Sequence, residues 1–130
     1  MLSSYLAVMA GGAVGSAARL WMSGSLAARF GETFPVGTLA VNILGCLLIG
    51  IFTGLTKPEG LLTVSPVVRQ FVSIGVLGGF TTFSSFGLQT FNLIHDGEWL
   101  YAAGYIAASV IVCLAFVWVG IMLASILSPH

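Results

Sequence analysis

A run of nine residues near the middle of the chain places hydroxyl groups and aromatic rings inside an otherwise apolar segment. Residues 78–86 read Gly-Gly-Phe-Thr-Thr-Phe-Ser-Ser-Phe, so four hydroxyl side chains lie among three phenylalanines. In hydrocarbon, a polar group without a partner is strongly unfavourable, so such a run persists only where it faces protein, water or a substrate. The run therefore indicates a functional site rather than a lipid-filling helix.

The phenylalanines of this run have a spacing that suits an anion. Phe83 and Phe86 are three residues apart and are neighbours on one helix face, which Gln89 continues. Thr82 and Ser85 form a second row beside them. The edge of a phenyl ring is positive and can contact an anion without burying a full countercharge. Ring edges beside hydroxyl and amide donors favour a small, strongly hydrated anion, although phenylalanines at this spacing are also common in ordinary packing.

Glycines in the same segment disfavour an uninterrupted helix, and we expect a break around Gly78 to Thr81. A break would free backbone carbonyls at membrane depth, and the carbonyls of discontinuous helices coordinate small cations such as Na⁺. On a dimer axis, two copies of the break could share one ion. The alternative is that these glycines only permit close helix packing.

Three further polar positions lie inside apolar segments. The amide of Asn42 can donate to an anion, or it can hold two helices together. Tyr105 and Ser109 share one helix face and would complete a donor set if Ser109 faces Asn42; otherwise their hydroxyls bond the backbone. Arg19 either makes a vestibule attractive to anions or extends to the membrane interface beside Trp21.

The elements that must position these residues are four long apolar blocks. Of the 130 residues, 58% are hydrophobic and 6% are charged, and the mean hydropathy is +1.07. Soluble domains carry roughly 25% charged residues. The blocks cover about residues 2–28, 34–55, 67–93 and 99–127, and each exceeds the ~20 residues that cross a bilayer. The sequence predicts an all-α membrane protein, with residues 1–130 forming a single four-helix transmembrane domain.

The blocks contain no carboxylate, and both histidines, His95 and His130, are peripheral. The acidic residues all fall in predicted loops: Glu32, Glu59, Asp96 and Glu98. Proton-coupled transport needs an intramembrane group that titrates, so the sequence disfavours a small multidrug or cation exporter. A membrane anchor or assembly subunit is a third interpretation.

We interpret Cys46 and Cys113 as small buried hydrophobic side chains. We expect neither enzyme activity nor a nucleic-acid partner.

The four cations are divided equally between the two predicted membrane sides. Lys57 and Arg69 share a side with both termini, whereas Arg19 and Arg29 lie toward the other. Lys and Arg near helix ends set orientation, so an even division favours insertion both ways up. The two forms can then pair as an antiparallel dimer, unless lipids or a partner fix one orientation. One four-helix chain also offers little interior for a conduit, which favours an oligomer.

Four motifs together resemble the Fluc (CrcB-type) fluoride channels of prokaryotes. They are Gly-Gly-Ala-Val-Gly-Ser-Ala-Ala-Arg at 11–19, Gly-Thr-Leu-Ala-Val-Asn-Ile-Leu-Gly at 37–45, the run at 78–86, and Tyr-Ile-Ala-Ala-Ser at 105–109. The resemblance covers the whole chain in order. It implies an antiparallel, dual-topology homodimer in the prokaryotic plasma (inner) membrane, with two fluoride pores lined by both subunits and a central structural Na⁺.

By position, the resemblance implies a ring pair at Phe83 and Phe86, a nearby donor at Asn42, and pore-lining hydroxyls at Tyr105 and Ser109. The implied activity is passive export of F⁻ that protects the cell from fluoride toxicity. HF crosses membranes as a neutral molecule and ionises inside, so no energy coupling is required. This agrees with the lack of a carboxylate inside the apolar blocks.

The resemblance also implies a polar track at Thr82 and Ser85, and Na⁺ coordination by the carbonyls of Gly78 and Thr81. Arg19 matches the arginine of the family's first helix. One position departs from the pattern, because Gln89 stands where family members often have a glutamate. Any role of that acid is therefore in doubt for this chain.

Overall fold

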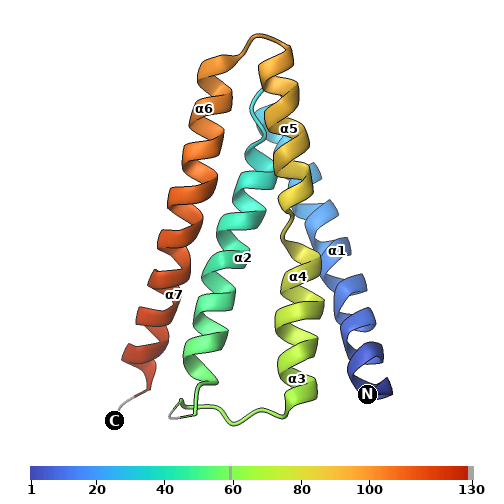
Figure 1. Cartoon of the computed structure of the whole chain (residues 1–130), viewed down its shortest axis with the longest axis vertical. Helices are drawn as coiled ribbons and strands as arrows, with labels where there is room; N and C mark the ends of the chain where they lie inside the picture. Colours follow the sequence, from blue (N-terminus) through green and yellow to red (C-terminus); the bar gives the residue numbers. More distant parts are fainter. Residues whose placement is uncertain (59, 129–130) are drawn as a thin grey trace.

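A computed structural model describes residues 1–58 and 60–128, and within these ranges every regular element is helical (Figure 1). Glu59 and His130 lie outside the described residues. The chain folds into four long helical segments, as expected. The elements are α1 (Leu2–Phe30), α2 (Val36–Leu55), α3 (Pro66–Gln70), η1 (Phe71–Val76), α4 (Leu77–Phe80), α5 (Phe83–His95), α6 (Trp99–Ala107), η2 (Ala108–Val112) and α7 (Cys113–Leu127). The third segment comprises α3 to α5 and the fourth comprises α6 to α7, each with a short π-helical stretch.

Successive segments alternate in direction, so α1 begins and α7 ends at the same end of the bundle (Figure 1). Arg29 lies in the last turn of α1 at the opposite end. Lys57 follows α2 and Arg69 lies in α3, both at the end where α1 begins. The guanidinium of Arg69 donates to the hydroxyl and the carbonyl of Thr56, which places a positive charge at the carbonyl end of α2.

Three helical stretches are long and apolar enough to cross a membrane: Val36–Leu55, Pro66–His95 and Trp99–Leu127. Many large hydrophobic side chains on them are exposed, including Ile111 and Trp118. Such a surface is compatible with lipid, whereas in water it would promote aggregation. α1 is as long but falls short of this hydropathy, because Arg19 and several serines and glycines interrupt it.

Small residues allow the helices to approach closely. A Cβ at Gly11 would lie 2.6 Å from the carbonyl oxygen of Phe71, and one at Gly15 would overlap the carbonyl oxygen of Val76. In α2, a Cβ at Gly37 would lie 2.6 Å from the carbonyl oxygen of Ser23. These contacts hold α1 against both η1 and α2.

The third segment is broken as predicted, but the break lies at Thr81 and Thr82, at the end of the expected range from Gly78 to Thr81. Gly78 and Gly79 still belong to α4, and the chain becomes extended only at Thr81 (φ −82°, ψ 159°) and Thr82 (φ −152°, ψ 120°). Neither glycine has a positive φ. Gly79 instead allows contact with α1, since a Cβ there would lie 2.7 Å from the carbonyl oxygen of Gly12. The break therefore depends on the threonines and not on glycine flexibility.

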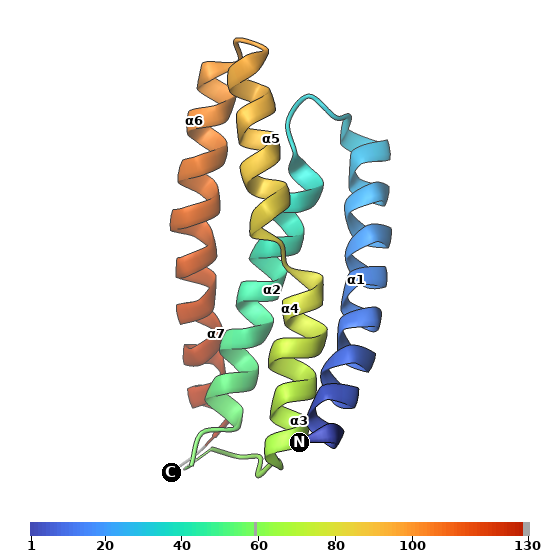
Figure 2. The ribbon, with the colours of Figure 1, turned by 45° about the vertical axis from the view of Figure 1, so that its right-hand side comes forward.

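The break also separates α1 from the end of the third segment. α1 packs along η1 and α4, and Figure 2 shows α5 turning away from it beyond the break. α5 packs instead against α6. The divergence leaves a cavity between the second half of α1, the loop at 31–35 and α5.

Candidate functional site at the helix break

Asn42 joins α2 to the break through both polar atoms of its side chain. Its Oδ1 accepts from the backbone N–H of Thr82 at 2.8 Å, and its Nδ2 donates to the carbonyl of Thr82 at 3.0 Å. Both backbone groups of this extended residue are thereby paired at membrane depth, where no water would satisfy them. The amide has a second N–H, which is not used in this pair. Asn42 is thus a structural residue of the break as well as a candidate donor.

Hydrogen bonds at the break leave two backbone carbonyls without the N–H partners that they would have in a continuous helix. In a continuous helix, Gly78 would bond the N–H of Thr82, but that N–H binds Asn42. Thr81 would bond the N–H of Ser85, but that N–H donates to Oγ1 of Thr82 at 3.2 Å. The freed carbonyls are those of Gly78 and Thr81, the two Na⁺ ligands that the family resemblance implies. Gly78 is exposed on this chain.

Beside the break lies a cavity of about 330 Å³, which we call the ring cavity. Its lining brings together most of the predicted pathway residues: Asn42, Thr82, Phe83, Phe86 and Ser109, with Gly78 and Thr81 at the break. Ser109 lies in η2, and its Oγ is buried without a hydrogen-bond partner among the described residues. A buried hydroxyl that bonds nothing is costly. The ring cavity therefore offers an uncommitted donor to a ligand.

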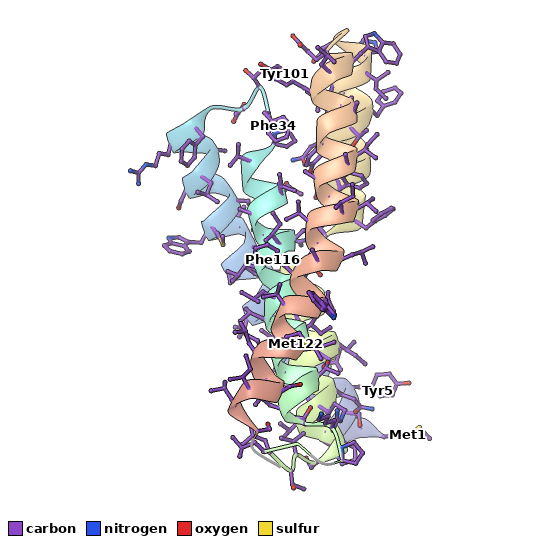
Figure 3. The ribbon with its side chains drawn as sticks, turned by 90° about the vertical axis from the view of Figure 1, so that its left-hand side faces the viewer. Met1, Tyr5, Phe34, Tyr101, Phe116 and Met122 are labelled. Carbon is purple, nitrogen blue, oxygen red and sulfur yellow. The ribbon has the colours of Figure 1, made fainter. Side chains whose placement is uncertain are left out.

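A series of aromatic rings leads away from this cavity. The centroids of Phe83 and Phe86 lie 5.4 Å apart, and those of Phe86 and Tyr105 lie 5.1 Å apart. Tyr105 is fully buried and contacts the ring of Phe34 edge to face at 5.6 Å, and Phe34 contacts Tyr101 at 6.0 Å. Figure 3 shows Phe34 and Tyr101 together at the loop end of the bundle. No local sequence pattern points to Phe34 and Tyr101, because their contact joins a loop to a distant helix.

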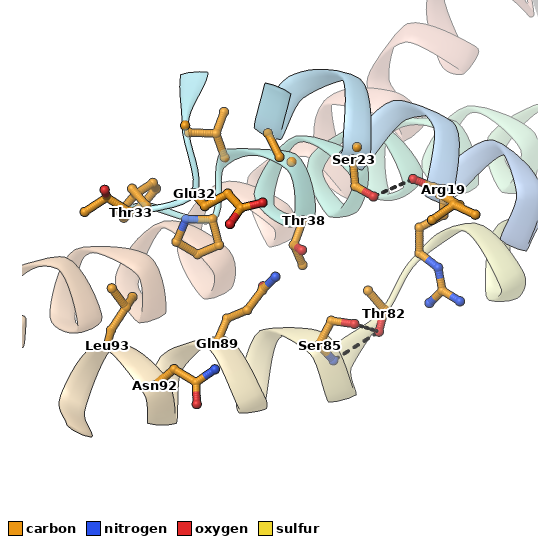
Figure 4. Close-up of a pocket in the computed structure, with 18 of the residues that line it drawn as sticks. Arg19, Ser23, Glu32, Thr33, Thr38, Thr82, Ser85, Gln89, Asn92 and Leu93 are labelled. Carbon is orange, nitrogen blue, oxygen red and sulfur yellow. Dashed lines mark hydrogen bonds between the residues drawn. The ribbon is translucent and has the colours of Figure 1, made fainter. Parts of the chain in front are cut away.

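The larger cavity, of about 970 Å³, is the vestibule between α1, the 31–35 loop and α5 (Figure 4). Arg19 is half-buried and lies at the same end of the vestibule as Thr82 and Ser85. Carboxylates from the loops also line the vestibule: Glu32, Asp96 and Glu98. Arg19 therefore lies at the deep end of a cavity that also has acidic residues.

Thr82 lines both cavities and stands between them. Its hydroxyl donates to Oγ of Ser85 at 3.1 Å, so the hydroxyl proton of Ser85 is left to donate into the vestibule. Gln89 also lines the vestibule, and its Oε1 accepts from the hydroxyl of Tyr105 at 2.7 Å. The Tyr105 hydroxyl is thus occupied by Gln89, and the Gln89 NH₂ group points into the vestibule (Figure 4). The sequence did not predict this pairing.

The fold and site define a small, multi-pass helical membrane protein with polar groups and freed carbonyls at a break in its third segment. A family model described as "CrcB-like protein, Camphor Resistance (CrcB)" matches residues 6–121. The chain belongs to this family.

Curated relatives extend over nearly the same length. A protein of Opitutus terrae named fluoride-specific ion channel FluC is 53% identical over 119 residues, which is 92% of this chain and 90% of the relative. Proteins of the same name from Rhodospirillum rubrum and Methylocella silvestris are 50% and 51% identical, over 90% and 92% of this chain and 91% and 92% of their own lengths. The resemblance found in the four motifs is confirmed.

Proposed function

We propose that this chain is a fluoride-selective channel that lets F⁻ leave the cell passively and so protects it from fluoride toxicity. The observation that carries the proposal is the ring cavity, where the unpartnered hydroxyl of Ser109 lies with the rings of Phe83 and Phe86. Ring edges and a neutral donor can replace the hydration of a small anion without fixing it by a full charge. The relatives named as fluoride-specific channels support the choice of ion.

The proposed route runs from the vestibule, past Thr82, into the ring cavity. Arg19 attracts the anion at the deep end of the vestibule, and the free hydroxyl proton of Ser85 donates to it there. Asn42 and Ser109 then offer donors beside the two rings. Tyr105 contributes by holding Gln89 in place. Gln89 presents a neutral amide, so passage at this position involves no protonation step.

A second copy of the chain is proposed to complete the pore. Phe83 is 82% exposed, and the ring cavity opens on the surface of the single chain. In a bilayer, an ion path open to lipid would be strongly unfavourable. An antiparallel, dual-topology homodimer would close two such paths, each lined by both chains. Arg29 lies at one end of the bundle and Lys57 and Arg69 lie at the other, while Arg19 lies inside the vestibule, so the charges set only a weak preference for one orientation. We place this single four-helix domain, with α1 as its fourth span, in the prokaryotic plasma (inner) membrane.

The proposed dimer also brings two breaks together. Four freed carbonyls, from Gly78 and Thr81 of each chain, would then surround one structural Na⁺. Native mass spectrometry of the purified protein in Na⁺ is expected to show two chains with one tightly held Na⁺. Exchange into a large organic cation should remove the ion and weaken the dimer. A monomer, or a dimer of equal stability without Na⁺, would contradict the arrangement.

Fluoride selectivity is tested by efflux from liposomes that contain the purified protein. We expect F⁻ to leave far faster than Cl⁻, with no dependence on a proton gradient. The reason is that no carboxylate lies within the described helical spans to couple a proton. Protein-free liposomes give the background rate. Equal F⁻ and Cl⁻ rates would refute selectivity, and a required proton gradient with cation flux would favour the exporter alternative.

A further inference from the structure

The two cysteines of the chain lie on facing sides of α2 and α7, one turn before a close approach of these helices. These helices run in the same direction and pack side by side (Figure 1). A Cβ at Gly50 would overlap the carbonyl oxygen of Val117 and lie 3.1 Å from Cα of Gly120. Cys46 is one turn before Gly50, and Cys113 is one turn before Val117. The register that pairs Gly50 with Val117 therefore also pairs Cys46 with Cys113.

The thiols occupy the ring cavity and not a separate part of the core. Both are free, and both line the cavity that holds Phe83 and Phe86. Cys113 is buried and Cys46 is half-buried. The chain has no other cysteine. This placement goes beyond the interpretation of each thiol as a small hydrophobic side chain.

Two thiols that meet across parallel helices are a chelating pair for a soft metal ion. Soft thiolate ligands select ions such as Cu⁺, whereas Na⁺, Mg²⁺ and Ca²⁺ prefer oxygen. Ions such as Hg²⁺, Ag⁺ and Cu⁺ bind two sulfur atoms in a linear arrangement, so no third ligand is needed. This is consistent with the described residues, which contain no cluster of three or more metal-binding side chains.

We propose that Cys46 and Cys113 form a two-coordinate site for a thiophilic metal ion, and that its occupation closes the proposed fluoride path. Each S–H releases its proton to water as the metal forms one bond to each sulfur, and no atom is oxidised or reduced. With Hg²⁺ the product is neutral, and with Ag⁺ or Cu⁺ it carries one negative charge. The bound metal occupies space beside the two rings, and a negative product also repels an anion.

The test uses Hg²⁺ and the purified full-length protein, reduced beforehand and kept free of chloride. Native mass spectrometry should show one Hg²⁺ per chain with the loss of two protons. The metal should resist an excess of 2-mercaptoethanol. Cys46→Ser and Cys113→Ser should each bind Hg²⁺ at least ~100-fold more weakly, because the second bond is no longer intramolecular. Two independently bound Hg²⁺ per chain, or single variants as tight as the wild type, would overturn the site.

A second measurement does not depend on variants that fold. X-ray absorption at the mercury edge of the wild-type protein should find two sulfur neighbours per metal, and a single sulfur neighbour would contradict chelation. In liposomes, Hg²⁺ should reduce fluoride efflux of the wild type to the protein-free rate and leave the double serine variant at its own starting rate. Binding without inhibition would overturn the closure. This last readout rests on the proposed function, whereas the stoichiometry and the sulfur count do not.

Discussion

Replacing Asn42 with alanine is expected to abolish fluoride flux and to destabilise the fold. The variant removes the partner of the Thr82 N–H and one of the partners of the Thr82 carbonyl, which as the N-cap of α5 also accepts the first hydrogen bond of that helix. Each buried group left unpaired costs about 1–3 kcal/mol, and the N–H of Thr82 can recover a partner only by returning to the carbonyl of Gly78. The break would then rewind toward a continuous helix, and the freed carbonyl would be lost.

Fluoride efflux from liposomes and the thermal unfolding midpoint in detergent measure the two effects. Ser25→Ala is the matched control, since this exposed hydroxyl bonds only the carbonyl of Trp21 in its own helix. We expect the control to keep wild-type flux and stability. An Asn42→Ala protein with wild-type flux would show that the break does not need the Asn42 amide.

Phe83→Ile and Phe86→Ile are each expected to slow fluoride flux by about two- to tenfold while the fold is retained. Isoleucine keeps a large apolar side chain but has no aromatic ring edge. Aromatic edge contacts contribute about 0.5–1.5 kcal/mol, and about 1.4 kcal/mol at the barrier changes a rate tenfold. Phe86→Ile also removes the ring contact with Tyr105, so we expect its effect to be the larger.

Growth of cells that lack other fluoride defences gives a second measurement. The wild-type chain should restore growth in fluoride, and Phe83→Ile should not. Phe91→Ile is the control, because Phe91 lies on the same helix but is exposed and outside both cavities. Rescue by Phe83→Ile at wild-type level would argue that the rings only pack.

The helices were predictable because each depends on a local property of the sequence. The long apolar runs predict α2 and the fourth segment to within two residues at each end. The position of the break was not predictable from composition. Gly78 and Gly79 suggested an earlier break, but the backbone turns extended where Asn42 binds Thr82, a contact between residues 40 positions apart.

The candidate site shows the same division between local and distant information. The spacing of Phe83 and Phe86 predicts that their rings are neighbours, and the structure confirms this contact. Spacing within one helix cannot show that Tyr105 donates to Gln89 or contacts Phe34. These pairs depend on how the α5 and α6 hairpin meets the loop before α2. From the sequence, Thr82 is one of two hydroxyl residues on a helix face. Only the structure shows that it lines both cavities.

The way Thr82 is held bears on how an ion could cross the protein. Its N–H, carbonyl and hydroxyl are all engaged, by Asn42 on α2 and by Ser85 in the first turn of α5. A residue tied to two helices in this way is unsuited to swing aside during transport. We therefore expect Thr82 to keep its position between the vestibule and the ring cavity while an ion passes beside it. Passage beside a fixed residue would follow the electrochemical gradient, unlike transport by a carrier that must reorient once for each ion.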